Sequence, residues 1–182
     1  MNLRLIRIVR RAVGLVGIAL FCLLAGFSIF TRAAPLLGSQ LYIVGGGSME
    51  PAIPTGSLVL VAHVDPGAVR VGDVVTIRAE SGIVITHRVS RVVDMPEGRF
   101  FELKGDANRS PDAGLLPAAA IVGAAGQFIP YAGYAQSYHS TLAGQAGALA
   151  ILGLFLLAYV LLDMLHGHAR ANTVPTQEPV GP

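Results

Sequence analysis

The 182-residue sequence has one cysteine, one lysine and few charged residues of any kind. Cys22 has no second cysteine to pair with, so no intramolecular disulfide can form and cysteine use indicates no compartment. Charged residues make up 13% of the chain, about half the ~25% of an ordinary soluble domain. The formal net charge of +2 is too small to indicate a nucleic-acid partner.

The hydrophobic residues are instead concentrated in two uncharged stretches near the ends of the chain. The first, residues 12–30, has 19 residues, and a helix of that length rises about 28 Å, close to the roughly 30 Å core of a bilayer. The second covers residues 142–162, with Gln145 as its main polar interruption. Both stretches predict transmembrane helices. A cleavable signal peptide is the alternative for the first, because small residues follow at 31–35, although signal peptides usually have shorter apolar runs of about 7–15 residues.

The arginines predict how these helices are oriented. Four of them lie within residues 1–11, whereas only Arg32 closely follows the first span. The positive-inside rule therefore puts the N-terminus in the cytoplasm, the middle of the chain outside and residues 163–182 back in the cytoplasm. Residues 171–182 are polar and contain proline, and we expect them to be disordered. The prediction is a multi-pass protein of the cell membrane.

Residues 35–135 predict a single, mainly β, extracytoplasmic domain between the two spans. Runs of β-branched residues alternate with Gly, Pro and Asp turns, and no window between residues 50 and 130 has a convincing helical period. This pattern indicates an all-β domain rather than alternating strands and helices. The apolar segment 35–44 has two interpretations, a first strand or a segment that dips into the membrane interface. The predicted strands cover residues 57–61, 74–77, 83–93 and 100–103.

Ser48 is the candidate nucleophile. It lies in Gly45-Gly46-Gly47-Ser48-Met49-Glu50-Pro51, about 18 residues after the first uncharged stretch. A serine hydroxyl needs a base within hydrogen-bond reach and donors for the oxyanion. The preceding glycines would let the backbone approach a substrate closely and adopt turns closed to other residues. The alternative is a flexible loop with an incidental serine.

The candidate base is one of five histidines. His166 and His168 lie past the second span, and His139 lies close to it. His63 stands beside a predicted turn, where a surface histidine is expected. His87 follows a β-branched run and is expected to end or interrupt a strand, where its side chain can be aimed firmly. A lone histidine in a strand is usually structural, so His87 gains weight only from the neighbouring motifs.

The candidate carboxylates are Asp106 and Asp112, six residues apart in a turn-rich segment that begins at Gly105. A carboxylate is needed to fix the tautomer of a catalytic histidine and to stabilise its imidazolium. Two aspartates in one loop are also ordinary turn chemistry. The sequence of this segment alone does not decide between a catalytic carboxylate and ordinary turn residues.

Four ordered motifs lie between the predicted spans: Ser48-Met49-Glu50-Pro51, Gly72-Asp73-Val74-Val75, Thr86-His87-Arg88-Val89 and Lys104-Gly105-Asp106-Ala107-Asn108 with Asp112. Together with Pro130-Tyr131-Ala132-Gly133 they resemble signal peptidase I, in the endoplasmic-reticulum-type branch also found in archaea and some bacteria. The resemblance covers about residues 12–162, and it departs from the family where three glycines precede the serine in place of larger residues.

The resemblance implies a membrane-anchored serine endopeptidase that removes signal peptides from exported preproteins, after small residues at positions −1 and −3. In the family's pattern Ser48 is the acylating nucleophile and His87 its base, with Asp112 as third member and Asp106 supporting the site. The family's β-domain binds its substrate as an added strand. The implied partners are preproteins and the lipid bilayer. No cofactor or metal is expected, and the sequence does not indicate whether accessory membrane subunits are needed.

Two other hypotheses stay open at this point. The chain could be a non-catalytic membrane-anchored β-domain that scaffolds an envelope or pilus complex, in which case Ser48→Ala would change nothing. It could also be a peptidase that uses Lys104 as its base, since the common bacterial branch of the family pairs serine with lysine. Loss of activity in Lys104→Arg but not in His87→Ala would favour the lysine mechanism.

Overall fold

The computed structural model of the chain describes residues 3–79 and 81–171, which divide into two compact units. One unit comprises the two terminal segments, up to Ser28 and from Leu142, and the other covers Ile29–Thr141. Except for Ala171, the tail predicted to be disordered lies outside the described residues.

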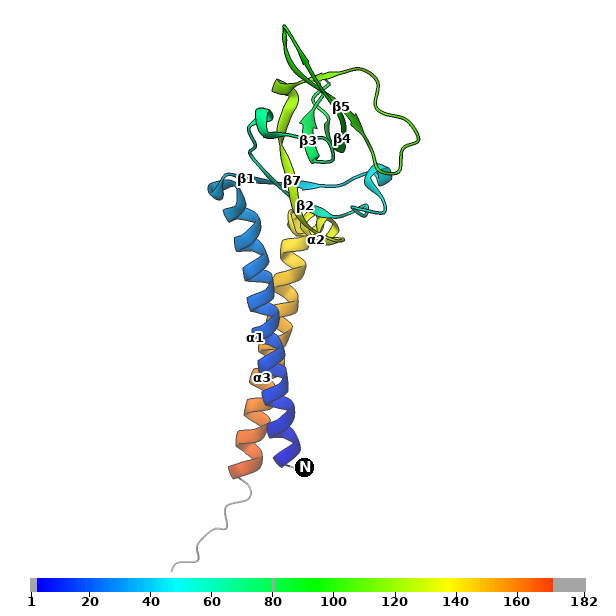
Figure 1. Cartoon of the computed structure of the whole chain (residues 1–182). Coiled ribbons are helices and arrows are strands. Elements are labelled where there is room, and N and C mark those ends of the chain that lie inside the picture. Colours follow the sequence, from blue (N-terminus) through cyan, green and yellow to red (C-terminus); the bar gives the residue numbers. More distant parts are fainter. Residues whose placement is uncertain (1–2, 80, 172–182) are drawn as a thin grey trace, which may run out of the picture. The chain divides into compact units, whose positions relative to one another are not determined.

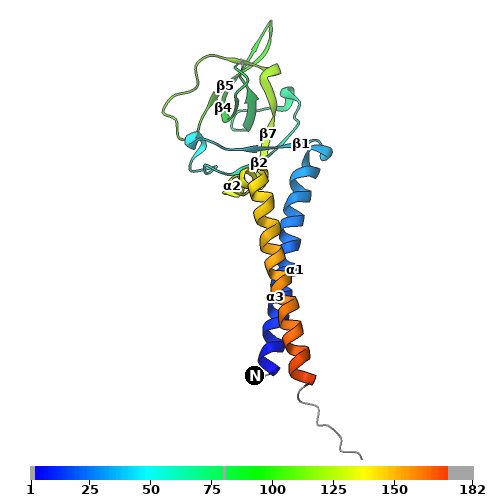
Figure 2. The ribbon, with the colours of Figure 1, turned by 180° about the vertical axis from the view of Figure 1, so that it is seen from behind.

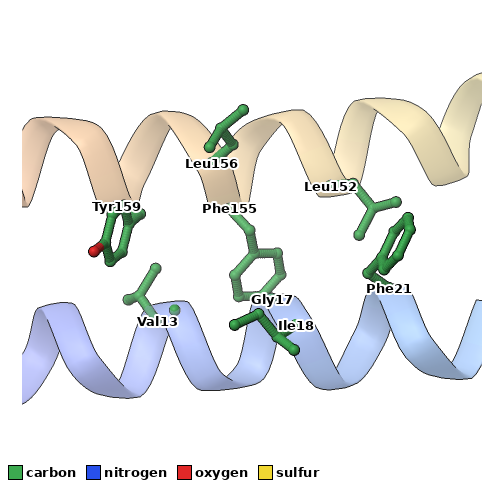
Figure 3. Close-up of a pocket in the computed structure, with 9 residues that line it drawn as sticks. Val13, Gly17, Ile18, Phe21, Leu152, Phe155, Leu156 and Tyr159 are labelled. Carbon is green, nitrogen blue, oxygen red and sulfur yellow. The ribbon is translucent and has the colours of Figure 1, made fainter.

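The helical unit is made by α1 (Leu3–Ala33) and α3 (Leu142–Ala171), which run antiparallel and side by side (Figures 1 and 2). Both are long and apolar enough to cross a membrane, with mean hydropathies of 2.5 and 2.4 in their apolar parts. Gly14 favours their close approach, because a Cβ there would lie 3.2 Å from the Tyr159 ring, closer than an ordinary contact. Figure 3 shows the Phe155 ring beside Gly17, in an apolar groove of about 400 Å³.

The other unit is built on one antiparallel sheet that curves into a half-barrel, with strand order β1-β2-β7-β3-β4-β5-β6. A short α-helix, α2 (Ala132–His139), follows the last strand. The prediction of a mainly β domain flanked by two long apolar helices is confirmed. The strands are β1 (Ser39–Ile43), β2 (Leu58–Ala62), β3 (Val74–Arg78), β4 (Val84–Met95), β5 (Gly98–Lys104), β6 (Leu116–Pro117) and β7 (Ile121–Ile129).

Alternation along the strands places one set of apolar side chains inside the half-barrel. Two buried clusters result. The first holds β3, β4 and β5 together, and the second packs the turn that contains Ser48 against β2. Their members are Val69, Val75, Ile77, Val89, Phe101 and Leu103 in the first, and Met49, Ile53, Val59 and Val61 in the second.

Segment 35–44 combines two structures. A 3₁₀ turn, Ala34–Leu37, is followed by β1, which pairs in register with β2 from Ser39↔Ala62 to Ile43↔Leu58. The interpretation as a first strand is therefore correct for the second half of the segment. In the turn, Leu36 and Leu37 are more than 80% exposed.

Candidate active site

His87 lies inside a strand, which corrects the expectation that it would end or interrupt one. It is the fourth residue of β4 and pairs with Val75 of β3. The strand continues through it because the β-branched run extends on both sides. The pleat, rather than a strand end, aims the side chain: His87 points to the same face as the buried Val89 and away from the face of Arg88. The whole residue is only 6% exposed.

The imidazole of His87 joins two of the candidate residues. Its Nε2 lies 3.0 Å from Ser48 Oγ, and its Nδ1 lies 2.5 Å from Asp112 Oδ2. An ionised carboxylate can only accept, so the proton of the neutral ring belongs on Nδ1 and leaves Nε2 free to accept the serine hydroxyl. Ser48, His87 and Asp112 therefore have the geometry of a nucleophile, a general base and the group that orients the base.

Asp106 lies apart from this chain of hydrogen bonds. Arg88 Nε donates to its Oδ1 at 2.8 Å and Arg88 Nη2 donates to its Oδ2 at 2.7 Å. The guanidinium holds the pKa of the Asp106 carboxyl below its usual value, and the same hydrogen bonds raise the pKa of Arg88. Arg88 Nη1 also donates to the Gly72 carbonyl at 2.7 Å. The pair thus ties the loop after β5 to the turn before β3.

The same loop holds the backbone of the nucleophile. Ala107 N–H donates to the Ser48 carbonyl at 2.9 Å. Gly105 passes so close that a Cβ there would lie 2.6 Å from the same oxygen, a separation that only a residue without a side chain can accept. Met49, next to Ser48, is 1% exposed. Ser48 is therefore anchored on one side by the core and on the other by loop 105–108.

A second set of contacts fastens the chain that follows Ser48. The Glu50 carboxylate accepts hydrogen bonds from Thr55 N–H at 3.2 Å and Thr55 Oγ1 at 2.7 Å. These bonds lower the pKa of the Glu50 carboxyl. Ile53 N–H donates to the Met49 carbonyl at 2.8 Å. The turn that carries the nucleophile is thus closed by its own hydrogen bonds.

The glycines before Ser48 do not adopt the conformation closed to other residues that glycine would allow, although Gly47 begins the 3₁₀ turn Gly47–Met49. None of Gly45, Gly46 and Gly47 has positive φ, and Gly46 is extended with φ −127° and ψ 159°. A Cβ at Gly45 or Gly46 would meet nothing within 4 Å. The backbone here needs no glycine for its conformation, because none of the three residues lies in the left-handed region that favours glycine. The three residues leave an open, exposed stretch beside the nucleophile.

Lys104 lies on the other face of the sheet from His87. It pairs with Arg88 across β4 and β5, and directly opposed residues of an antiparallel pair share one face. It lines a cavity of about 210 Å³ with Arg88 and Asp106. His63 is exposed, as expected. The contribution of Arg88 was not predicted, although its place directly after a strand histidine, and therefore on the opposite face, was a usable signal.

The described residues, 3–79 and 81–171, contain no group of three or more His, Cys, Asp or Glu side chains arranged to hold a metal ion. The Ser48, His87 and Asp112 side chains are placed for proton transfer between Ser48 and His87, with Asp112 on the far side of the ring. Such a site can carry acyl transfer.

Comparison with known proteins finds signal peptidases among the relatives of this chain. The chain is 30% identical over 152 residues to the putative signal peptidase complex catalytic subunit SEC11B of Homo sapiens, covering 73% of this chain and 92% of the relative. It is 36% identical over 104 residues to the human signal peptidase complex catalytic subunit SEC11C, covering 52% and 54%.

A bacterial relative is also found. The chain is 35% identical over 79 residues to signal peptidase I W of Bacillus subtilis (strain 168), covering 43% of this chain and 42% of the relative. The matches to this protein and to SEC11C thus span about half the length of each relative. No family model matches the sequence. The long match to SEC11B nevertheless covers nearly all of that protein, and with it the chain belongs to the signal peptidase I family of hydrolases, in the endoplasmic-reticulum-type branch.

Proposed function

We propose that this chain is a membrane-anchored serine endopeptidase that cleaves N-terminal signal peptides from preproteins through an acyl-enzyme on Ser48. Membership of a family named for signal peptide cleavage supports the reaction. One observation carries the mechanism: His87 hydrogen-bonds Ser48 Oγ through one ring nitrogen and Asp112 through the other.

In the proposed reaction, Ser48 Oγ attacks the carbonyl carbon of the scissile peptide while His87 Nε2 takes the hydroxyl proton. The Ser48 backbone N–H is our candidate donor to the oxyanion. The tetrahedral intermediate then collapses, the C–N bond breaks, and the imidazolium gives its proton to the leaving amine. Water, deprotonated by His87, hydrolyses the acyl-enzyme. Asp112 holds the imidazole in position and stabilises its positive charge throughout.

The open stretch before Ser48 is the proposed path for the substrate backbone. Gly46 has the dihedral angles of a strand, and the space beside Gly45 and Gly46 is empty. An extended preprotein could lie along it as an added strand, which uses main-chain hydrogen bonds for affinity and pockets for alternate side chains for selectivity. We infer that small side chains at −1 and −3 are selected there.

The membrane placement is part of the proposal. With α1 and α3 both spanning the bilayer, the arginines before the first span put the N-terminus in the cytoplasm and the β-domain on the extracytoplasmic side of the cell membrane. A signal peptide that crosses the membrane would then present its cleavage site to the domain. Two of the relatives are named as subunits of a complex, so accessory subunits belong in the assay design.

The test is cleavage of a preprotein with an Ala-x-Ala site by the purified full-length chain in liposomes, alone and with solubilised membranes of the expressing cell. Wild type should cleave after the second alanine, and acid-quenched samples should contain an acyl adduct on Ser48. Ser48→Ala should do neither. Cleavage by Ser48→Ala at the wild-type rate would exclude this mechanism. Lack of cleavage and of adduct under every condition would favour the non-catalytic scaffold.

A further inference from the structure

A second polar site lies in the helical unit, away from Ser48 in the sequence. The end of α1 that carries the arginines and the end of α3 enclose a groove of about 460 Å³. Its walls are polar, unlike the apolar groove between the middle parts of the same helices. The lining residues are Arg7, Arg10, Arg11, Asp163, His166 and Gly167.

The groove lies at a defined depth along both helices. Arg11 directly precedes the uncharged residues 12–30, and Asp163 directly follows the uncharged residues 142–162. If the uncharged parts of the two helices fill the hydrocarbon core, the groove residues on both helices lie at the level of the lipid headgroups. Under the proposed orientation this is the cytoplasmic leaflet, where anionic lipids are concentrated.

The charges in the groove do not cancel. Three guanidinium groups face one carboxylate, so 3 − 1 leaves an excess of +2 with the histidine neutral. Arg10 is held in place by an ion pair with Asp163 and by the ring of Tyr159, 5.9 Å from its guanidinium carbon. Its buried Nε has no hydrogen-bond partner among the described residues. Arg10 is thus fixed with a donor unused, while Arg7 and Arg11 are exposed beside it.

We propose that this groove binds the phosphate of one anionic lipid headgroup. A planar guanidinium donates two parallel hydrogen bonds to phosphate oxygens, and the exposed Arg7 and Arg11 present two such groups one turn apart on α1, beside the guanidinium of Arg10. The bound lipid would fasten the ends of α1 and α3 to the bilayer surface. The proposal depends on the membrane placement given above and not on the catalytic mechanism.

The test is native mass spectrometry of the full-length chain, purified in detergent to which phosphatidylglycerol or phosphatidylcholine has been added. The quantity measured is the number of lipid molecules that stay bound when the detergent is removed in the gas phase. We expect one phosphatidylglycerol per chain and much weaker retention of phosphatidylcholine. Arg7→Gln and Arg11→Gln should each weaken phosphatidylglycerol binding about fivefold, the loss that corresponds to about 1 kcal/mol per arginine near a membrane surface. The matched control is Arg4→Gln, which removes a charge from the same end of α1 but not from the groove lining, and should have a smaller effect.

Three outcomes would overturn the proposal. Equal losses for Arg4→Gln, Arg7→Gln and Arg11→Gln would indicate diffuse attraction rather than a site. Equal retention of the two lipids would remove the requirement for negative charge. Displacement of phosphatidylglycerol by an equal concentration of inorganic phosphate would assign the groove to free phosphate instead of lipid. Preprotein cleavage, measured in parallel, reports separately on the proposed enzyme activity, which Arg7→Gln and Arg11→Gln should retain in detergent.

Discussion

Arg88 occupies both carboxylate oxygens of Asp106, at 2.8 and 2.7 Å. The loop sequence alone did not show which aspartate, Asp106 or Asp112, orients His87, and this pairing distinguishes them. Asp112, six positions later, reaches Nδ1 of His87. Because Arg88 and His87 are neighbours in one strand, their side chains leave opposite faces of the sheet and each takes a different aspartate.

Asp112→Asn should lower kcat about 10⁴-fold, because an amide no longer fixes the histidine tautomer or stabilises the imidazolium. Asp106→Asn should lower kcat far less, since the aspartate it replaces is bonded to Arg88. The measurement is single-turnover cleavage of a preprotein by each variant. A larger loss for Asp106→Asn would show that the hydrogen bond from His87 to Asp112 is not the one used in catalysis.

The ion pair of Arg88 with Asp106 should make stability depend on acid. The guanidinium lowers the pKa of folded Asp106 below the unfolded value of about 3.9. The stabilisation is therefore complete above that pH and is lost as the pH falls through the lower, folded pKa. The Asp106→Asn variant should unfold at lower temperature than wild type at pH 7, and the gap should narrow as the pH is lowered below about 4. A gap that stays constant with pH would mean that the charge of Asp106 contributes nothing.

Gly105→Ala should both destabilise the domain and reduce activity. The added Cβ would lie 2.6 Å from the Ser48 carbonyl oxygen, so the two loops must separate, at a cost typical of overpacking, about 1–3 kcal/mol. Thermal unfolding and kcat can be measured on the same preparation. Wild-type stability together with wild-type kcat would show that this close approach does not hold Ser48 in place.

Gly46→Ala should reduce activity without destabilising the domain. A Cβ at Gly46 meets nothing and the backbone is already extended, so the unfolding temperature should match that of wild type. If the substrate backbone runs along this stretch, the methyl group should lower kcat/KM. An unchanged kcat/KM would move the proposed substrate path away from Gly46.

Much of the fold could be predicted because its signals are local. The β-branched run that begins at residue 83 belongs to a strand, and the turn residues at 96–98 separate it from the next one. Residues 12–30 and 142–162 lie within long apolar helices for the same reason, since length and absence of charge are properties of the sequence itself. The resemblance to signal peptidase I, carried by short ordered motifs, is confirmed by the relatives.

The details of the site depend on pairings that no local pattern encodes. The position of His87 within β4 is set by its register with β3, and the face of Lys104 is set by its register with Arg88. The glycines at 45–47 were expected to allow turns closed to other residues, and this part of the expectation was wrong. Glycine permits such a conformation without requiring it. The need for a glycine at 105 arises only from the approach of a carbonyl 57 residues earlier in the chain, that of Ser48.

The most direct test of the proposed mechanism is cleavage of one preprotein by wild type, His87→Ala and Lys104→Ala in the same liposomes. His87 hydrogen-bonds Ser48, whereas Lys104 lies on the opposite face of the sheet. We predict that His87→Ala loses about 10⁴-fold or more in rate, while Lys104→Ala stays within about tenfold of wild type. Activity retained in His87→Ala and lost in Lys104→Ala would contradict the account and assign the chain a serine–lysine mechanism.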